Sequence, residues 1–247
     1  MDIAGSIALV TGANRGIGRH VATQLLARGA ATVYATARNP DAVDVPGARV
    51  LALDITDPAS VAAAAQAAGD VTLLVNNAGI STYTDLVSGD LEKIRLEVET
   101  HVFGTLAVVR AFAPVLAATG GGAGGGAILN VLSALSWTSY QGATAYAAAK
   151  AAEWSLTNGI RLELAGQRTL VTGLHTGSVD TDMMAGWDVP KNDPADVVRA
   201  ALDGIEADAL EVLVDDASRQ AKAALGLDPS AVYPQATPAA WTGTAAG

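Results

Sequence analysis

The segment IALVTGANRGIG, residues 7–18, decides the fold of this chain. Its first four residues, Ile7–Val10, are a continuous apolar run that predicts a buried strand, and apolar residues recur at helical spacing from Ile17 to Arg28. The glycines between them allow a sharp turn, let a pyrophosphate approach the backbone amides and let the helix pack close to the sheet. The partial positive charge at the helix N-terminus then favours phosphate. A glycine string alone also fits a plain turn, but its position between strand and helix predicts a dinucleotide-binding loop.

The same alternation of strand and helix continues along the chain. The strand-like runs are continuously apolar, which is typical of a parallel sheet covered on both faces. We therefore predict a single α/β domain over residues 1–247, a Rossmann-type doubly wound parallel sheet of about seven strands flanked by helices. The predicted strands are Ile7–Val10, Thr32–Ala35, Val50–Leu53, Val71–Val75, Ala127–Leu132, Leu170–Leu174 and Glu211–Val214. The predicted helices are Ile17–Arg28, one that starts at Asp57-Pro58, Leu91–Ala118, Ala143–Leu164 and Pro194–Ile205.

Three segments read as irregular connections. The glycine run at 120–126 predicts a flexible surface connection with no ligand role. Residues 178–193 are predicted to be a substrate loop, part of which orders on binding because strong periodicity is missing there. The stretch 229–247 is rich in Ala, Thr and Pro and is predicted to be a flexible tail.

Composition excludes several classes of protein. The chain has 247 residues and no cysteine, so it has no disulfide framework and no thiolate chemistry. A net charge of -10 and a pI near 4.6 argue against a surface that binds nucleic acid. The densest apolar stretch, Leu106–Ala118, is interrupted by Arg110 and Pro114, so we predict no membrane-spanning segment. With no basic leader, the expected location is the cytoplasm, and no metal site is predicted.

Two arginines bear on the choice of nicotinamide cofactor. In dinucleotide-binding folds an acidic residue about 20 residues after the glycines accepts from a ribose 2′-hydroxyl and repels a 2′-phosphate. This chain has Arg38 in that region and Arg15 inside the glycine loop. Two guanidiniums can clamp a phosphate through charge-assisted hydrogen bonds, which predicts NADP(H). The alternative is that both are solvated surface arginines.

Tyr146, Lys150 and Ser133 form the candidate catalytic group. Tyr146 and Lys150 are one helical turn apart and share a face. A free phenol, with a pKa of about 10, is a poor acid or base at neutral pH, but a nearby ammonium favours the phenolate. Ser133, at the end of a predicted strand, can donate to the same substrate oxygen. A lone Tyr and Lys at this spacing would otherwise read as a surface pair.

Taken together, these residues resemble the classical short-chain dehydrogenase/reductase family, and the resemblance covers nearly the whole chain. The matching positions, in chain order, are Thr11–Gly18, Asp54, Asn76–Gly79, Ser133, Tyr146, Lys150 and the later Gly177–Thr181.

The resemblance implies transfer of a hydride between a nicotinamide and a carbon that bears oxygen. It implies that Tyr146 is the general acid/base, that Ser133 positions the carbonyl or alcohol, and that Lys150 binds the nicotinamide ribose and tunes Tyr146. Asp54 and Ile55 would lie near the adenine. Residues 76–79 would lie beside the adenosine ribose, and Val179 with Thr181 would hold the carboxamide. The predicted cofactor contacts are Gly12, Asn14, Arg15, Gly16, Ile17, Gly18, Arg38, Asp54, Ile55, Asn76, Ala78, Gly79, Tyr146, Lys150, Val179 and Thr181.

The chain departs from the family at two positions. The family usually has an Asn in the long helix that holds a proton-relay water, and His101 stands there. A neutral imidazole can hold such a water, whereas a protonated one loses its acceptor and adds a positive charge near Lys150. We predict a substituted relay at His101; the alternative is a packed histidine in a slow or inactive enzyme. Thr176 replaces the usual Pro before Gly177, which predicts a less constrained turn, and His175 beside it is predicted to be structural.

The predicted substrate site lies outside the carboxyl ends of the strands. Segments 81–83, 135–141 and 182–187 reach that edge and supply apolar side chains, so a hydrophobic ketone or alcohol is expected. The last two segments contain no Arg or Lys that could anchor a carboxylate or phosphate substrate. The predicted lining residues are Leu135, Trp137, Gln141, Met183, Met184 and Trp187, with Tyr83 beside them.

The sequence favours an NADP(H)-dependent carbonyl reductase or alcohol dehydrogenase over three other functions. A catalytically silent dinucleotide-binding protein is motivated by His101 and Thr176, but Ser133, Tyr146 and Lys150 argue against it. An NTPase needs Lys-Ser/Thr after the glycines, which this chain lacks. A sugar epimerase or dehydratase needs a larger C-terminal domain. Because both long helices are apolar on more than one face, a homodimer or homotetramer is expected.

Overall fold

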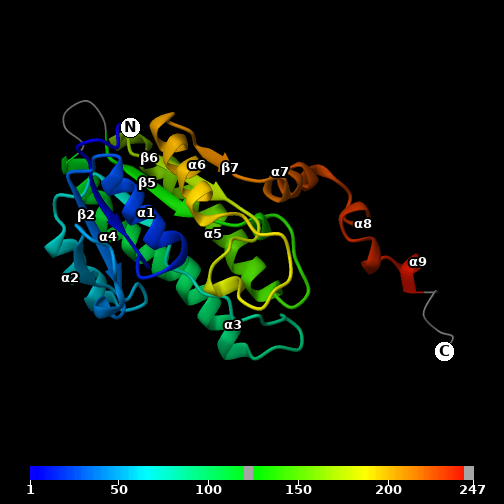
Figure 1. Cartoon of the computed structure of the whole chain (residues 1–247). Helices are drawn as coiled ribbons and strands as arrows, with labels where there is room; N and C mark the ends of the chain where they lie inside the picture. The colour runs from blue at the N-terminus through cyan, green and yellow to red at the C-terminus, as the bar shows by residue number, and fades with distance from the viewer. Residues whose placement is uncertain (120–124, 242–247) are drawn as a thin grey trace.

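Seven parallel strands form one sheet in the computed structural model, which describes residues 1–119 and 125–241 (Figure 1). The strand order is β3-β2-β1-β4-β5-β6-β7, so the chain builds the sheet outward in both directions from β1 and β4. This topology confirms the predicted doubly wound α/β fold. The strands are β1 Ile7–Val10, β2 Thr32–Ala37, β3 Arg49–Ala52, β4 Leu73–Asn76, β5 Ala127–Val131, β6 Leu170–His175 and β7 Glu211–Leu213.

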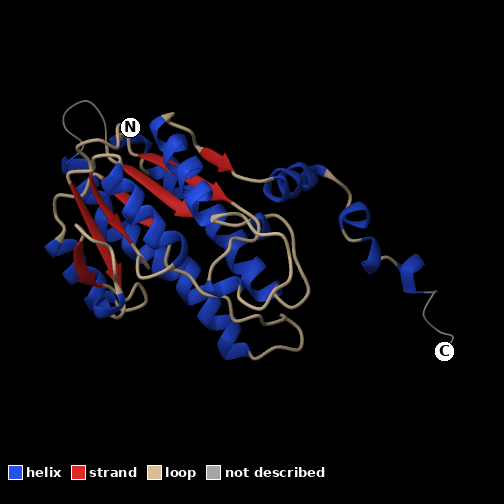
Figure 2. Ribbon diagram, viewed as in Figure 1, coloured by secondary structure: helices blue, strands red, loops and turns tan. Residues whose placement is uncertain are grey.

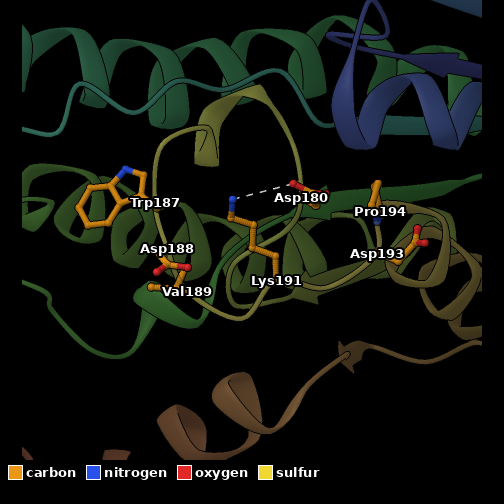
Figure 3. A pocket seen from close by; sticks show the side chains of 7 residues that line it. All are labelled: Asp180, Trp187, Asp188, Val189, Lys191, Asp193 and Pro194. Atoms are coloured by element: carbon orange, nitrogen blue, oxygen red, sulfur yellow. Dashed lines mark ion pairs between the residues drawn. The ribbon is translucent and has the colours of Figure 1, made fainter.

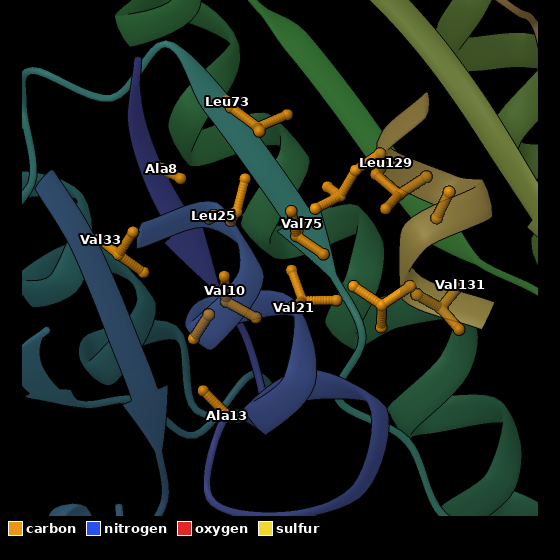
Figure 4. Close-up of a cluster of buried hydrophobic side chains, with 14 of the residues drawn as sticks. Ala8, Val10, Ala13, Val21, Leu25, Val33, Leu73, Val75, Leu129 and Val131 are labelled. Carbon is orange, nitrogen blue, oxygen red and sulfur yellow. The ribbon is translucent and has the colours of Figure 1, made fainter. Parts of the chain in front are cut away.

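Helices cover both faces of the sheet (Figure 2). On one face α1 (Gly16–Ala27) and α6 (Pro194–Glu206) share an apolar cluster with the strands, part of which Figure 4 shows. On the other face α2 (Pro58–Ala67), α4 (Thr105–Thr119) and α5 (Thr144–Glu163) contribute to a second cluster. Both faces of the sheet are therefore buried, which is why the central strands are continuously apolar.

Local sequence signals set several element boundaries. Asp57 accepts a hydrogen bond from the Ala59 backbone N–H with Pro58 at the first helical position of α2, as predicted. Asp193 caps α6 in the same way. The connection predicted at 120–126 falls mostly on residues 120–124, which lie outside the described residues. The short helices before α6 are η1 Pro40–Ala42, η3 Ala134–Ser136, η4 Ala165–Gln167 and η5 Asp182–Met184.

The long helix predicted over Leu91–Ala118 contains a π-helical turn. It begins as α3 (Leu91–Val98), widens in η2 (Glu99–Gly104) and continues as α4. Single π-helical turns inside α-helices are frequent at functional sites. Here the π-helical turn carries His101.

The prediction that no segment could span a membrane is wrong by length and composition. Leu91–Thr119 forms one helix that is long and apolar enough to cross a bilayer. Its charge and proline did not lower the mean hydropathy of the stretch enough to exclude it. In this fold the helix packs Val108, Phe112 and Leu116 against the sheet.

The C-terminal segment forms short helices that lead away from the sheet (Figure 1). The described part of the predicted tail, 229–241, contains helical turns. Each of its three short helices begins with a Pro, and Asp228 caps the first of them. The helices of this arm are α7 Asp216–Ala223, η6 Ala224–Gly226, α8 Pro229–Val232, η7 Pro234–Ala236 and α9 Pro238–Trp241.

Candidate active site

The glycine loop connects β1 to α1 at the carboxyl edge of the sheet. Gly12 has a φ of +67°, a conformation that side chains disfavour. A Cβ on Gly18 would lie 2.2 Å from the Gly12 carbonyl oxygen, so the helix can approach the loop this closely only with glycine there. Arg15, the N-cap of α1, forms no side-chain cap hydrogen bond within the described residues, and the first turn carries no acidic residue. The loop therefore fits an anionic pyrophosphate.

Asn77 holds the glycine loop against the end of β4, and sequence reasoning missed this role. Its side-chain amide donates to the Thr11 carbonyl at 2.9 Å and to the Gly12 carbonyl at 3.1 Å. The Thr11 hydroxyl in turn accepts from the backbone N–H groups of Asn77 and Ala78 at 2.9 Å. The two predicted cofactor segments are thus tied into one unit. The repeated Asn in the sequence was the available signal.

The two arginines predicted to select the cofactor are both exposed. Arg15 lies 3.4 Å from Asp182 of the predicted substrate loop, between Nη1 and Oδ2. Arg38 lies near Asp54: burial raises the pKa of that carboxyl slightly, but hydrogen bonds from Thr56 and the Arg38 charge lower it overall. Arg38 directly follows β2, and its role toward the cofactor stays a prediction.

Ser133, Tyr146 and Lys150 converge as predicted. Ser133 lies two residues after β5, and its hydroxyl is near enough to the Tyr146 phenol to lower the pKa of that phenol. The Lys150 ammonium lies 5.8 Å from the centre of the Tyr146 ring. Helix α5 places both side chains on one face, since they are one turn apart. Lys150 donates to the Val131 carbonyl at 2.8 Å and to Glu153 Oε2 at 2.6 Å, so β5 and α5 fix the ammonium together.

Burial changes the expected acidity of the phenol. In this chain burial raises the pKa of Tyr146, and the Lys150 ammonium lowers it by less, so the net pKa lies above its ordinary value. The Glu153 carboxylate, which pairs with the same ammonium, adds to this rise. The prediction that Lys150 together with the nicotinamide charge favours the phenolate stays a prediction for the cofactor-bound protein.

His101 lies beside Tyr146, with ring centres 5.3 Å apart in an edge-on arrangement. Its Nε2 is 2.8 Å from the Ile80 carbonyl oxygen, and only 1% of the residue is exposed. Burial and Lys150 lower the pKa of His101, but the nearby carboxylates of Glu153 and Glu97 outweigh them and raise it. Nδ1 has no hydrogen-bond partner among the described residues, and the proton relay at His101 stays a prediction.

Sequence reasoning missed Glu97 and Glu153. Both are buried, one on α3 and the other on α5. Each lies next to His101: Glu97 Oε2 is 3.4 Å from Nε2, and Glu153 Oε2 is 3.5 Å from Nδ1. Helical spacing was the available signal, because Glu97 is four residues before His101 and Glu153 is three residues after Lys150.

His175 supports Ser133 from behind, in agreement with its predicted structural role. Its Nδ1 donates to the Ser133 carbonyl at 3.1 Å, and its ring stacks on Trp137 at 3.7 Å between ring centres. Burial lowers the pKa of His175 to about 4. The ring is therefore neutral at physiological pH and carries its proton on Nδ1.

The turn at Thr176 is well restrained, contrary to the expectation from its missing proline. Asp215 Oδ2 accepts from the Gly177 backbone N–H at 2.7 Å and from the Asn192 amide at 2.5 Å. The Thr176 hydroxyl donates to the same oxygen at 3.3 Å. The carboxylate of Asp215, the N-cap of α7, thus restrains the turn that a proline at position 176 would otherwise restrain. Several of these contacts lower the pKa of Asp215 despite its partial burial.

The other residues that are predicted to contact the cofactor come from four separate segments of the chain. Val179 is buried and bridges to Asn192 in a short parallel pairing, and Thr181 lies 3.2 Å from the position a Gly16 Cβ would take. Ile55 is buried after β3. The Asn76 side-chain amide donates to Asn130 at 2.9 Å inside the sheet, away from the loop surface. Asn14 is half-buried in the glycine loop.

The predicted substrate residues are only partly brought together. Tyr83, Met183 and Trp187 meet: the Tyr83 hydroxyl donates to the Met183 carbonyl, and its ring stacks with Trp187 at 5.7 Å. Trp137 is instead buried between His175 and Trp154, with 9% of its surface exposed. Leu135 and Met184 are half-buried, and Gln141 is exposed.

Two pockets lie at this edge. The first, of about 370 Å³, is formed by the predicted substrate loop and carries an ion pair of 3.9 Å between Lys191 and Asp180 (Figure 3). Trp187 is the one predicted lining residue in it, while Gln141 lines the second pocket, of about 350 Å³. The first pocket is lined by Asp180, Trp187, Asp188, Val189, Lys191, Asp193 and Pro194.

Known proteins share this fold and sequence. A short chain dehydrogenase from Burkholderia cenocepacia, solved in complex with NADP, is 38% identical, covers 96% of this chain and all of its own length, and superposes with a TM-score of 0.90. The 3-ketoacyl-(acyl-carrier-protein) reductase of Brucella melitensis, solved with NADH, is 26% identical, with a TM-score of 0.79 over 87% of this chain and 99% of that one. The 3-oxoacyl-[acyl-carrier-protein] reductase FabG of Salmonella typhimurium is 34% identical over 74% of this chain and 77% of its own.

The family model for short chain dehydrogenases matches residues 6–192. That range includes the glycine loop, the segment after β4, and Ser133, Tyr146 and Lys150 in their converged positions. The chain therefore belongs to the short-chain dehydrogenase/reductase family of oxidoreductases.

Proposed function

We propose that this protein is an NADP(H)-dependent oxidoreductase that interconverts a hydrophobic ketone and its secondary alcohol. The observation that carries the proposal is the convergence of Ser133, Tyr146 and Lys150 at the edge of the sheet that also holds the glycine loop. The nicotinamide, when bound, supplies or accepts the hydride. The side chains of this protein supply the proton and the geometry.

Tyr146 exchanges the proton with the substrate oxygen. The neighbouring Ser133 hydroxyl lowers the pKa of Tyr146 and caps η3 by accepting from the Leu135 backbone N–H at 3.1 Å. The cap holds Ser133 in place, so its hydroxyl can orient a carbonyl or alcohol toward Tyr146. Lys150 is fixed by its two hydrogen bonds and favours the phenolate electrostatically.

Arg38 and Arg15 support the choice of NADP(H). Both are exposed guanidiniums, Arg15 in the glycine loop and Arg38 directly after β2, a position where no acidic side chain repels a phosphate. A 2′-phosphate brings two negative charges that these groups can bind through charge-assisted hydrogen bonds. The B. cenocepacia relative, solved with NADP, agrees with this choice.

Three exposed apolar side chains support a hydrophobic substrate. Tyr83, Met183 and Trp187 are 42%, 38% and 37% exposed, and Tyr83 contacts both of the others. These exposed apolar side chains come from segments at the carboxyl edge of the sheet and offer a surface for a bulky apolar ketone. We also propose that the protein works in the cytoplasm as a homodimer or homotetramer, since Phe103 and Leu162 on the long helices are 54% and 79% exposed.

The test is NADPH and NADH consumption, followed at 340 nm, with a panel of bulky ketones. We expect turnover with at least one ketone and a higher kcat/KM with NADPH. Tyr146→Phe should lower kcat by about 10²- to 10⁴-fold, the usual contribution of a general acid. Tyr34→Phe is a matched control, because Tyr34 lies on β2 and its hydroxyl donates to Asp70, outside the segments of the predicted site. Unchanged turnover in Tyr146→Phe would refute the mechanism, and a parent protein that turns over no ketone would refute the function.

A further inference from the structure

His101 is enclosed by four ionisable side chains. Glu97 comes from α3, and Glu153, Lys150 and Tyr146 come from α5. Glu97 and Glu153 are 0% and 2% exposed, so water cannot screen these charges. The cluster is also compact, because a Cβ on Gly79 would lie 2.7 Å from the His101 Cε1.

The contacts of the two ring nitrogens determine the protonation state of His101. Nε2 lies 2.8 Å from the Ile80 carbonyl oxygen and 3.4 Å from the Ile80 backbone nitrogen. The shorter contact is to an oxygen that can only accept, so it favours a proton on Nε2. The other nitrogen, Nδ1, faces Glu153 Oε2 at 3.5 Å, and this oxygen already accepts from Lys150. Nδ1 forms no hydrogen bond within the described residues, so its contact with Glu153 is electrostatic. A lone pair on Nδ1 would face a carboxylate oxygen and repel it, whereas a proton there makes the contact attractive. These contacts favour a proton on both ring nitrogens.

Charge balance leads to the same state. With a neutral His101, the Lys150 ammonium would be the single cation against two buried carboxylates, and the cluster would carry a net negative charge. An uncompensated buried charge is strongly unfavourable. A protonated His101 makes the cluster neutral. Glu97 remains in place through Thr82, whose backbone N–H and hydroxyl donate to Glu97 Oε1 at 2.5 and 2.9 Å.

We propose that Glu97 and Glu153 hold His101 as a buried imidazolium beside Tyr146, where it acts as a second cation that favours the phenolate. The part of this proposal that concerns catalysis rests on the proposed function. Glu97 is then a positioning residue, because it acts on Tyr146 through His101. The second cation is needed because Glu153 offsets the charge of Lys150.

The charge of His101 is measured directly by NMR titration of the cofactor-free protein. The chain has three histidines, so single substitutions at His20 and His175 assign the signals. We expect the His101 signals to stay at imidazolium values through neutral pH in the parent. Glu97→Gln should lower the titration midpoint by about one pH unit or more, since a buried hydrogen-bonded carboxylate is lost. Glu99→Gln, at an exposed position two residues away, should not move it.

The effect on Tyr146 is measured by the pH dependence of kcat/KM for alcohol oxidation, which requires the phenolate. His101→Asn leaves both carboxylates facing Lys150 alone and should raise the midpoint of the activity profile by about one to two pH units, the effect of a unit charge at about 5 Å. In the double variant His101→Asn/Glu97→Gln the excess carboxylate is gone, so the midpoint should return toward the parent value. A purely structural role of His101 predicts no such rescue.

The outcomes separate the two proposals. A neutral His101 in the parent at pH 7, or a titration midpoint that Glu97→Gln leaves unchanged, would overturn the imidazolium whether or not the protein is an active enzyme. A charged His101 with an unchanged activity profile in His101→Asn would remove its role toward Tyr146. A charged His101 in a protein that turns over no ketone would leave the imidazolium established and refute the proposed function.

Discussion

Replacing His175 tests how burial of one imidazole makes the stability of this protein depend on pH. His175 is fully buried, and its pKa falls from 6.5 in the unfolded chain to about 4 in the fold. Between these values the unfolded chain binds a proton that the native state excludes, so stability is lost as the pH falls. A difference of about 2.5 between the two pKa values corresponds to about 3 kcal/mol in total, and about 2 kcal/mol of this is lost at pH 5.

His175→Asn removes the titration and keeps an N–H donor near the Ser133 carbonyl. We expect the variant to be less stable than the parent at pH 7.5, because the ring stacked on Trp137 is lost. The informative quantity is the difference between the free energies of unfolding at pH 7.5 and pH 5, measured by urea denaturation followed by circular dichroism. This difference should be about 2 kcal/mol smaller in His175→Asn than in the parent.

Other acidic groups, including Glu153 and Asp215, also lose their stabilising contacts on acidification, but they do so equally in both proteins and cancel from the comparison. Equal losses of stability in parent and variant between the two pH values would refute the assignment of a low pKa to His175. A denaturant dependence that differs between the proteins would show a change in the unfolded state, so the slopes must be compared first.

Three further substitutions test the anchors of the site. Arg38→Asp should shift the ratio of kcat/KM for NADPH and NADH toward NADH by tenfold or more, and a variant that still prefers NADPH would contradict the phosphate clamp. Asp215→Ala leaves the Gly177 and Asn192 donors without their acceptor. It should lower the free energy of unfolding, measured by urea denaturation, by about 3 kcal/mol. A loss below about 1 kcal/mol would mean that other contacts restrain this turn. Gly18→Ala forces a Cβ against the Gly12 carbonyl and should lower the free energy of unfolding by about 2 kcal/mol or more. In the matched control Gly159→Ala the Cβ meets nothing within 4 Å, so the same measurement should show α5 stabilised by up to about 1 kcal/mol.

The local sequence was sufficient to predict the fold. A parallel doubly wound sheet was predicted from continuous apolar strands, the glycine loop and the alternation with helices. Each of these signals depends only on residues that are close together in the sequence. The Tyr146 and Lys150 pair was found for the same reason, since one helical turn fixes their relation. The π-helical turn at Glu99–Gly104 was not predicted, because apolar periodicity is too coarse to register one extra residue in a turn.

The environment of the catalytic group was decided by the tertiary structure. Glu97, His101 and Glu153 belong to different turns of two helices, and only the packing of α3 and η2 on α5 brings their charges together without water. The same packing buries Tyr146 and raises its pKa, and the arrival of Asp215 at Thr176 depends on where α7 begins. Spacing along the chain thus determines which side chains share a helix face or a loop. Burial and the meeting of distant charges depend on how the elements pack, and these determine which of those side chains are ionised.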